Sequence, residues 1–183
     1  MRRALALLLL STAPALAQAP DQGKRATIDR LLAALKSAPD EETATILETH
    51  LSQMWLQAGT PAVTLLMSRG LRELQAGAQH DAVEDFGDAA VLDPDLAAAW
   101  REQAEARYAA GDVAGAVADL EQAIRHEPRD FLAFRMLSNI AAARGNWKAA
   151  YEAWQTLLAI DPKTQGGQRR LQDLRRRAYG ENT

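Results

Sequence analysis

The stretch that decides the fold is residues 97–130, AAAWREQAEARYAAGDVAGAVADLEQAIRHEPRD. It is dominated by alanine, glutamate, arginine and glutamine, which are strong helix formers. Gly111 interrupts the helical pattern in the middle of the stretch, and Pro128 follows its end. A glycine allows the left-handed turn that closes one helix, and a proline cannot continue the next one. The stretch therefore predicts two antiparallel helices joined by a tight turn.

The same pattern occurs three times with a period of 34 residues, which predicts repeats at 63–96, 97–130 and 131–164. The columns in this register are a glycine (Gly77, Gly111, Gly145), a proline (Pro94, Pro128, Pro162), an alanine (Ala82, Ala116, Ala150), a small residue (Gly70, Ala104, Ser138) and two large apolar residues (Leu66, Trp100, Phe134; Phe86, Leu120, Trp154). Small residues let two helices approach closely, and large residues interlock around them. One hairpin cannot cover its apolar face, whereas a stack of hairpins can.

This pattern resembles the tetratricopeptide repeat (TPR) family, whose unit is a 34-residue helix-turn-helix with the same residue types at these offsets. The resemblance covers residues 63–164. It implies an all-α fold, an α-solenoid of three repeats in which the first helix of each repeat lines a concave groove that binds a peptide. The family often carries an aromatic residue seven positions after the Trp column, and Glu73, Arg107 and Ala141 stand there in this chain. The groove is therefore expected to be more polar than in the family consensus.

Helices are also expected on both sides of the repeats. Residues 27–62 predict an N-terminal helical hairpin, with Ser37 as the N-cap of its second helix and an acid three residues later. Shifting the repeat register back places Thr43 at the glycine column and Glu48 at the alanine column, which favours a cap over a degenerate repeat. Thr60 before Pro61 predicts the start of the next helix. Residues 165–183 predict a C-terminal capping helix and tail, and residues 18–26 a flexible segment.

The first seventeen residues have the features of a signal peptide. A basic start at Arg2 and Arg3 precedes an apolar run at 4–10, and residues 15–17 form a small-x-small cleavage signal. The apolar run is shorter than the ~20 residues that a membrane-spanning helix needs. The sequence therefore predicts an exported bacterial protein, released into the periplasm after cleavage.

Composition excludes several classes of function. The 183 residues contain no cysteine, so the chain has no disulfide framework, thiolate metal site or cysteine nucleophile. It also has no phosphate-binding loop and no Gly-x-Ser-x-Gly motif, so we expect no enzyme, cofactor or bound metal. The net charge of −3 is unevenly distributed: residues 18–130 carry ten more acidic than basic side chains, and residues 131–183 carry five more basic than acidic ones. An acidic, exported chain is not expected to bind nucleic acid.

The resemblance to the TPR family also implies which side chains line the groove. By position in the repeat they are Met67, Leu71, Leu74, Arg101, Glu105, Tyr108, Arg135, Asn139 and Ala142, followed by Arg169 or Arg170 on the last helix. Arg135 and Asn139 are one helical turn apart, so both can reach one ligand. Family members that grip a carboxylate use a basic residue and an asparagine at this spacing. The alternative is that these arginines are solvated or paired with neighbours such as Glu102 and Glu105.

Two functions from different classes follow. The first is a protein-protein interaction module that acts as an adaptor or assembly factor by binding a segment of another envelope or periplasmic protein. The alternative is an envelope-associated structural protein, held at an anionic membrane surface by weak contacts of the arginine-rich last helix. The arginines of that helix are Arg169, Arg170, Arg175, Arg176 and Arg177. The sequence predicts neither the oligomeric state nor the identity of the partner.

Overall fold

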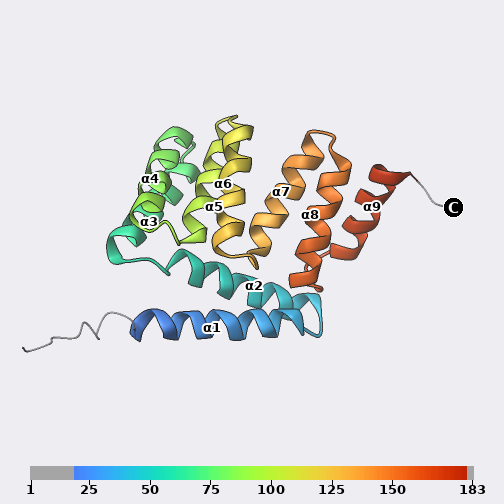
Figure 1. Cartoon of the computed structure of the whole chain (residues 1–183), viewed down its shortest axis with the longest axis horizontal. Coiled ribbons are helices and arrows are strands. Elements are labelled where there is room, and N and C mark those ends of the chain that lie inside the picture. The colour runs from blue at the N-terminus through green and yellow to red at the C-terminus, as the bar shows by residue number, and fades with distance from the viewer. Residues whose placement is uncertain (1–18, 181–183) are drawn as a thin grey trace, which may run out of the picture.

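A computed structural model describes residues 19–180, in which every regular element is an α-helix (Figure 1). The helices are α1 (Ala19–Lys36), α2 (Glu41–Leu56), α3 (Pro61–Gln75), α4 (Gln79–Leu92), α5 (Ala97–Ala109), α6 (Val113–His126), α7 (Phe131–Ala143), α8 (Trp147–Ile160) and α9 (Gly167–Tyr179). The predicted all-α class is confirmed. Within this described part, no helix is both long enough and apolar enough to cross a membrane. The expected signal peptide, residues 1–17, lies outside it.

Three helix pairs, α3 with α4, α5 with α6 and α7 with α8, form the repeats, and α9 stacks on the last of them (Figure 1). Each pair turns at the predicted glycine, with φ of 79° at Gly77, 88° at Gly111 and 73° at Gly145. Side chains other than glycine are strained at these angles. Each second helix ends two residues before the predicted proline, as α6 does at His126.

The repeating small residues lie where the two helices of a pair are closest. A Cβ atom placed on Gly70 would lie 2.8 Å from the ring of Phe86, which is completely buried. In the third repeat, the buried Ser138 hydroxyl donates a 2.8 Å hydrogen bond to the Ala150 carbonyl. The size pattern of the sequence therefore sets the spacing within each pair.

Helices α1 and α2 form a hairpin that does not continue the stack. They lie side by side across the edge of the repeats where the inter-repeat turns gather (Figure 1). Leu35 of α1 and Leu51 of α2 are completely buried and belong to the same core cluster as the repeats. The hairpin lacks the glycine and alanine columns, because Thr43 and Glu48 stand there, and it cannot pack as a further repeat.

Several helix ends differ from the expected ones. Helix α1 begins at Ala19, so most of segment 18–26, which was expected to be flexible, is helical. Lys24 in this part of α1 donates a 3.0 Å hydrogen bond to the carbonyl of Gln57. The N-cap of α2 is Asp40, which accepts from the amide of Thr43. Ser37 instead donates to carbonyls of α1.

The starts of α3 and α9 have local causes. Thr60 caps α3 ahead of Pro61 at the first turn, as predicted. Helix α9 begins at Gly167, two residues later than expected, because Gly166 adopts a left-handed φ of 64° and the turn before it packs closely. A Cβ atom on Gly167 would lie 2.7 Å from Leu158.

Candidate partner-binding groove

Helices α3, α5 and α7 are the first helices of the repeats and carry the nine predicted groove residues in three rows. The first row is Met67, Arg101 and Arg135; the second row is Leu71, Glu105 and Asn139; the third row is Leu74, Tyr108 and Ala142. Residues of one row are 34 positions apart, so each row runs across the stack. Successive rows are three or four residues apart on one helix face, which places them about one turn from each other.

The hairpin of α1 and α2 covers the first row. Met67 and Arg101 are only 1% and 5% exposed. The ring of Trp55 on α2 lies 5.5 Å from the ring of Phe131, which starts α7, and the Arg101 guanidinium lies 5.8 Å from the Trp55 ring centre. The N-terminal halves of α5 and α7 therefore face helix α2 of the hairpin.

Arg101 takes part in a buried ion network. It donates to Asp130 at 2.5 Å and to Glu102 at 2.9 Å, and Asp130 also caps α7 by accepting from the amides of Leu132 and Ala133. Burial opposes the charge of Arg101, but the two neighbouring carboxylates outweigh it and raise the pKa of the guanidinium. The guanidinium of Arg101 and the carboxylate of Asp130 are thus both paired within the fold.

Arg135 holds a carboxylate from the hairpin. Its guanidinium donates to Glu48 of α2 at 3.0 Å and to the hydroxyl of Thr164 at 2.8 Å, and Thr164 donates to Glu48 at 2.9 Å. The buried Asp161 lies beside this cluster, and burial together with Glu48 raises the pKa of Asp161 to about 7. Burial opposes ionisation of Glu48, but Asp161 and Arg135 outweigh it and lower the pKa of Glu48.

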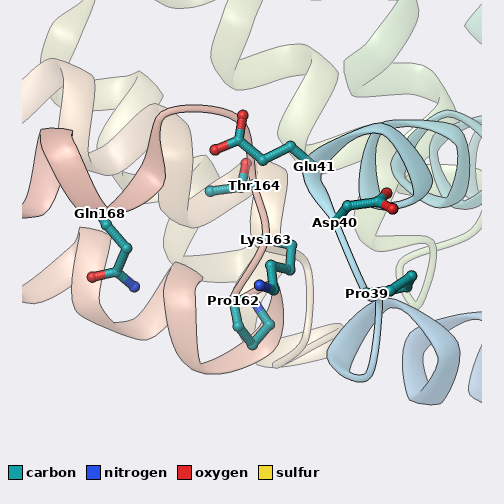
Figure 2. Close-up of a pocket in the computed structure, with 7 residues that line it drawn as sticks. All are labelled: Pro39, Asp40, Glu41, Pro162, Lys163, Thr164 and Gln168. Atoms are coloured by element: carbon teal, nitrogen blue, oxygen red, sulfur yellow. The ribbon is translucent and has the colours of Figure 1, made fainter.

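A crevice of about 530 Å³ lies next to this cluster, between the α1–α2 turn and the segment before α9 (Figure 2). Its lining residues are Pro39, Asp40, Glu41, Pro162, Lys163, Thr164 and Gln168. The Gly166 amide donates to Glu41 at 3.3 Å across this region. The hairpin therefore contacts the far end of the stack as well as its middle.

The second and third rows remain accessible. Leu71, Leu74 and Ala142 are half-buried, whereas Glu105, Tyr108 and Asn139 are exposed. Although part of Glu105 is in solvent, partial desolvation by the surrounding helices, and then the charge of Glu102, raise the pKa of its carboxyl group. These two rows form a strip with two leucines on α3, Glu105 and Tyr108 on α5, and Asn139 and Ala142 on α7.

Asn139 and Arg135, predicted to reach one ligand, are each bonded within the chain. Asn139 accepts a 3.0 Å hydrogen bond from Arg170 of α9, and the Arg170 guanidinium also lies 5.5 Å from the Trp154 ring centre. Arg135 bonds to Glu48. Arg169, the residue before Arg170 on α9, is exposed.

The other arginines of α9 divide between the fold and solvent. Arg177 lies over the ring of Trp147 at 4.6 Å, and Arg176 pairs with Asp173. Arg175 is exposed, like Arg169. Arg176 and Arg177 are exposed despite these contacts, so the anionic-surface alternative stays a prediction.

Sequence reasoning missed the residues that cover the groove. Glu48 and Trp55 are seven positions apart, which places them on one face of α2 two turns apart. That spacing is a detectable signal, but nothing in it indicates that Arg135 and Phe131 are the partners. Among residues 19–180, no cluster of three or more His, Asp or Glu side chains is arranged to hold a metal ion.

Local sequence similarity connects the chain to known TPR proteins, although no family model matches it. It is 50% identical over 56 residues to tetratricopeptide repeat protein 36 of Mus musculus, covering 31% of this chain and 30% of that one. It is 38% identical over 77 residues to the Homo sapiens protein of the same name, covering 42% and 41%. The chain thus spans well under half the length of these mammalian relatives.

Solved structures resemble it over a larger part. The first TPR of Spaghetti (RPAP3) bound to the HSP90 peptide SRMEEVD superposes with a TM-score of 0.59 at 16% identity, over 63% of this chain and 92% of that one. The fold is therefore an α-solenoid similar to those of TPR structures. The TPR2AB-domain:pHSP90 complex of yeast Sti1 gives a TM-score of 0.58 at 18% identity, over 86% and 64%. The predicted resemblance to the TPR family is supported by both kinds of comparison, and the solenoid here carries its own hairpin across the first row.

Proposed function

We propose that this TPR solenoid is a protein-protein interaction module that binds a segment of a partner protein along its second and third rows. The observation that carries this proposal is that the accessible side chains repeat at the same two positions of α3, α5 and α7. A strip of this kind presents regularly spaced contacts to one extended or helical segment. The first TPR of Spaghetti (RPAP3) is bound to an HSP90 peptide and the yeast Sti1 domain is in a complex with pHSP90, which supports a peptide ligand for this strip.

The chemistry of the strip indicates the kind of segment that fits. Leu71 and Leu74 offer apolar contact at one end, and the exposed Tyr108 offers an aromatic anchor in the middle. Aromatic anchors commonly dominate the energy of such interfaces. At the other end, Arg170 of α9 donates a hydrogen bond to Asn139 and supplies a positive charge. The preferred ligand is therefore a segment with apolar side chains at one end and acidic ones at the other.

The proposed setting is the bacterial envelope, where the module acts as an adaptor or assembly factor for another exported protein. The features of residues 1–17 support this proposal. Expression in a Gram-negative host followed by intact-mass measurement tests it, and the expected product is a periplasmic chain that begins at Gln18. A full-length chain that stays in the cytoplasm would contradict export and leave the binding proposal unaffected.

Site-specific photo-crosslinking tests the strip directly. A photoreactive amino acid at Tyr108 or Asn139 should give a crosslink to one defined partner in cells. The matched positions Glu121 on α6 and Gln155 on α8 are exposed on the second helices and should give none. Equal crosslinking from all four positions, or none from Tyr108 and Asn139, would refute binding along the strip.

Once the partner segment is identified, Tyr108→Ala should weaken its binding at least about tenfold, as loss of an aromatic anchor commonly does. Because Tyr108 is 40% exposed, the helix content should not change. Charge reversal of Arg101 is unsuitable as a binding test, since it would leave Asp130 and Glu102 buried without their cation.

A further inference from the structure

Helix α2 contacts the first row in the way that a bound helix contacts a groove. One of its faces carries two anchors, the Glu48 carboxylate on Arg135 and Thr164, and the Trp55 ring against Phe131 and Arg101. The anchors are two helical turns apart, or about 10 Å along the axis. The solvent face of the same helix carries Ile46, which is 53% exposed.

We propose that the hairpin of α1 and α2 is a built-in occupant of the groove, and that a partner reaches the first row by displacing it. The displacing segment is a helix with a carboxylate and a large aromatic side chain at the spacing of Glu48 and Trp55. This inference rests on the proposed function of the second and third rows, because a partner held there is placed beside the hairpin.

The polar contacts of the docked hairpin are incomplete, which favours exchange over a permanent core. The buried indole nitrogen of Trp55 has no hydrogen-bond partner among the described residues. Buried polar atoms in a permanent core are nearly always paired.

The charges that face the docked helix define the chemistry of its competitor. Arg101 is already neutralised by Asp130 and Glu102, so it offers only the face of its guanidinium to an aromatic ring. Arg135 has no carboxylate partner other than Glu48 in the described chain, and Lys163 is exposed nearby. The first row therefore binds one aromatic ring and one carboxylate.

The hairpin can leave the groove as a unit and remain attached. Residues 57–60 join it to α3, and Lys24 of α1 is bonded to the carbonyl of Gln57 at the end of α2. A tethered occupant of this kind has a millimolar effective concentration. A partner that contacts only the first row competes poorly, whereas one that also contacts Tyr108 and Asn139 gains enough affinity to displace it.

The test uses a fluorescent peptide with the sequence of residues 40–58 as the probe and full-length chains as its targets. The double variant Glu48→Lys with Trp55→Ala removes both anchors of the hairpin, so that the first row is open, and is called the displaced variant. The matched control, Glu42→Lys with Ile46→Ala, makes the same charge change and one apolar truncation on exposed positions of α2. The displaced variant should bind the probe at least tenfold tighter than the wild type and the control do.

A second peptide, carrying Glu48→Lys and Trp55→Ala itself, should bind none of the three chains. The inference is overturned if the displaced variant keeps its helix content and binds the native probe no tighter than the wild type does. It is also overturned if the altered peptide binds the displaced variant as tightly as the native probe does.

Hydrogen exchange of the wild-type chain decides the matter if the displaced variant does not fold. Amides of α2 should exchange faster than those of α5 to α8, because the hairpin opens while the repeats stay folded. Exchange of α2 only together with the repeats would overturn the inference. If a partner crosslinks at Tyr108 but does not change the hydrogen exchange of α2, the displacement is refuted and the proposed function is not. If the displaced variant binds the probe but no partner crosslinks at Tyr108, the proposed function is refuted and the displacement is not.

Discussion

Replacing Asp161 by asparagine should remove a large part of the pH dependence of this protein's stability. Asp161 is the C-cap residue of α8 and is completely buried, and its pKa is raised from 3.8 to about 7 by burial and by the neighbouring Glu48. Between these two pH values the folded chain keeps a proton that the unfolded chain releases. The free energy of unfolding therefore falls as pH rises through this window and levels off above about pH 7.

The size of the effect follows from the shift. One pKa unit corresponds to about 1.4 kcal/mol, so the full shift sets an upper limit of about 4 kcal/mol. Between about pH 5 and pH 8 only part of this window is crossed, and side chains relax around the new charge, so we expect a loss of about 2 kcal/mol. Lys163, exposed beside the crevice, is one side chain that can relax in this way (Figure 2).

Urea unfolding followed by circular dichroism, at about pH 5 and about pH 8, measures this difference. At the higher pH, Asp161→Asn should have a free energy of unfolding about 2 kcal/mol larger than that of the wild type. Its free energy of unfolding should also fall less than that of the wild type between about pH 5 and about pH 8. Asp88→Asn, on an exposed position of α4, is the matched control and should follow the wild type. Burial raises the pKa of Asp119 to about 6. Because Asp119 is present in all three chains, its contribution to the pH dependence cancels in the comparison. Equal pH slopes for the wild type and Asp161→Asn would refute the reasoning.

Three further substitutions test the packing by urea unfolding. Gly70→Ala should lower the free energy of unfolding by about 2 kcal/mol, because its methyl group would meet the ring of Phe86; a neutral effect would contradict the close packing. Asp130→Ala should cost about 3 to 5 kcal/mol, because it leaves Arg101 buried without its partner at 2.5 Å; a cost under about 1 kcal/mol would show that the pair contributes little. Arg129→Ala should cost less than about 1 kcal/mol, since its ion pair with α1 is exposed, and a larger cost would mean that this pair holds the hairpin.

The repeats were predictable because their determinants are local. Gly111 closes its hairpin through its own φ angle, and Pro128 ends its helix through its own ring. Gly70 permits the approach of a side chain only sixteen positions away, Phe86. A motif that recurs in the same register three times repeats these local effects, so the hairpins and the positions on their inner faces could be read from the chain.

The occupancy of the groove was not predictable in this way. Arg135 was expected to be available for a ligand, and the structure pairs it with Glu48, a residue 87 positions earlier. For Arg101 the alternative of pairing with Glu102 is confirmed, but its second partner, Asp130, was not predicted. Nothing periodic relates α2 to the repeats, so no pattern in the sequence indicates which helix lies against which row.

By itself, the sequence determined an all-helical stack of three helix hairpins and the three rows on the first helix of each, because turn glycines, small residues and prolines act within their own repeat. Only the tertiary structure decided that the first row is covered and the other two are open. That outcome depends on contacts such as Thr164 with Glu48, 116 positions apart. Such contacts form only when the whole stack presents a surface that buries Trp55 and neutralises Glu48.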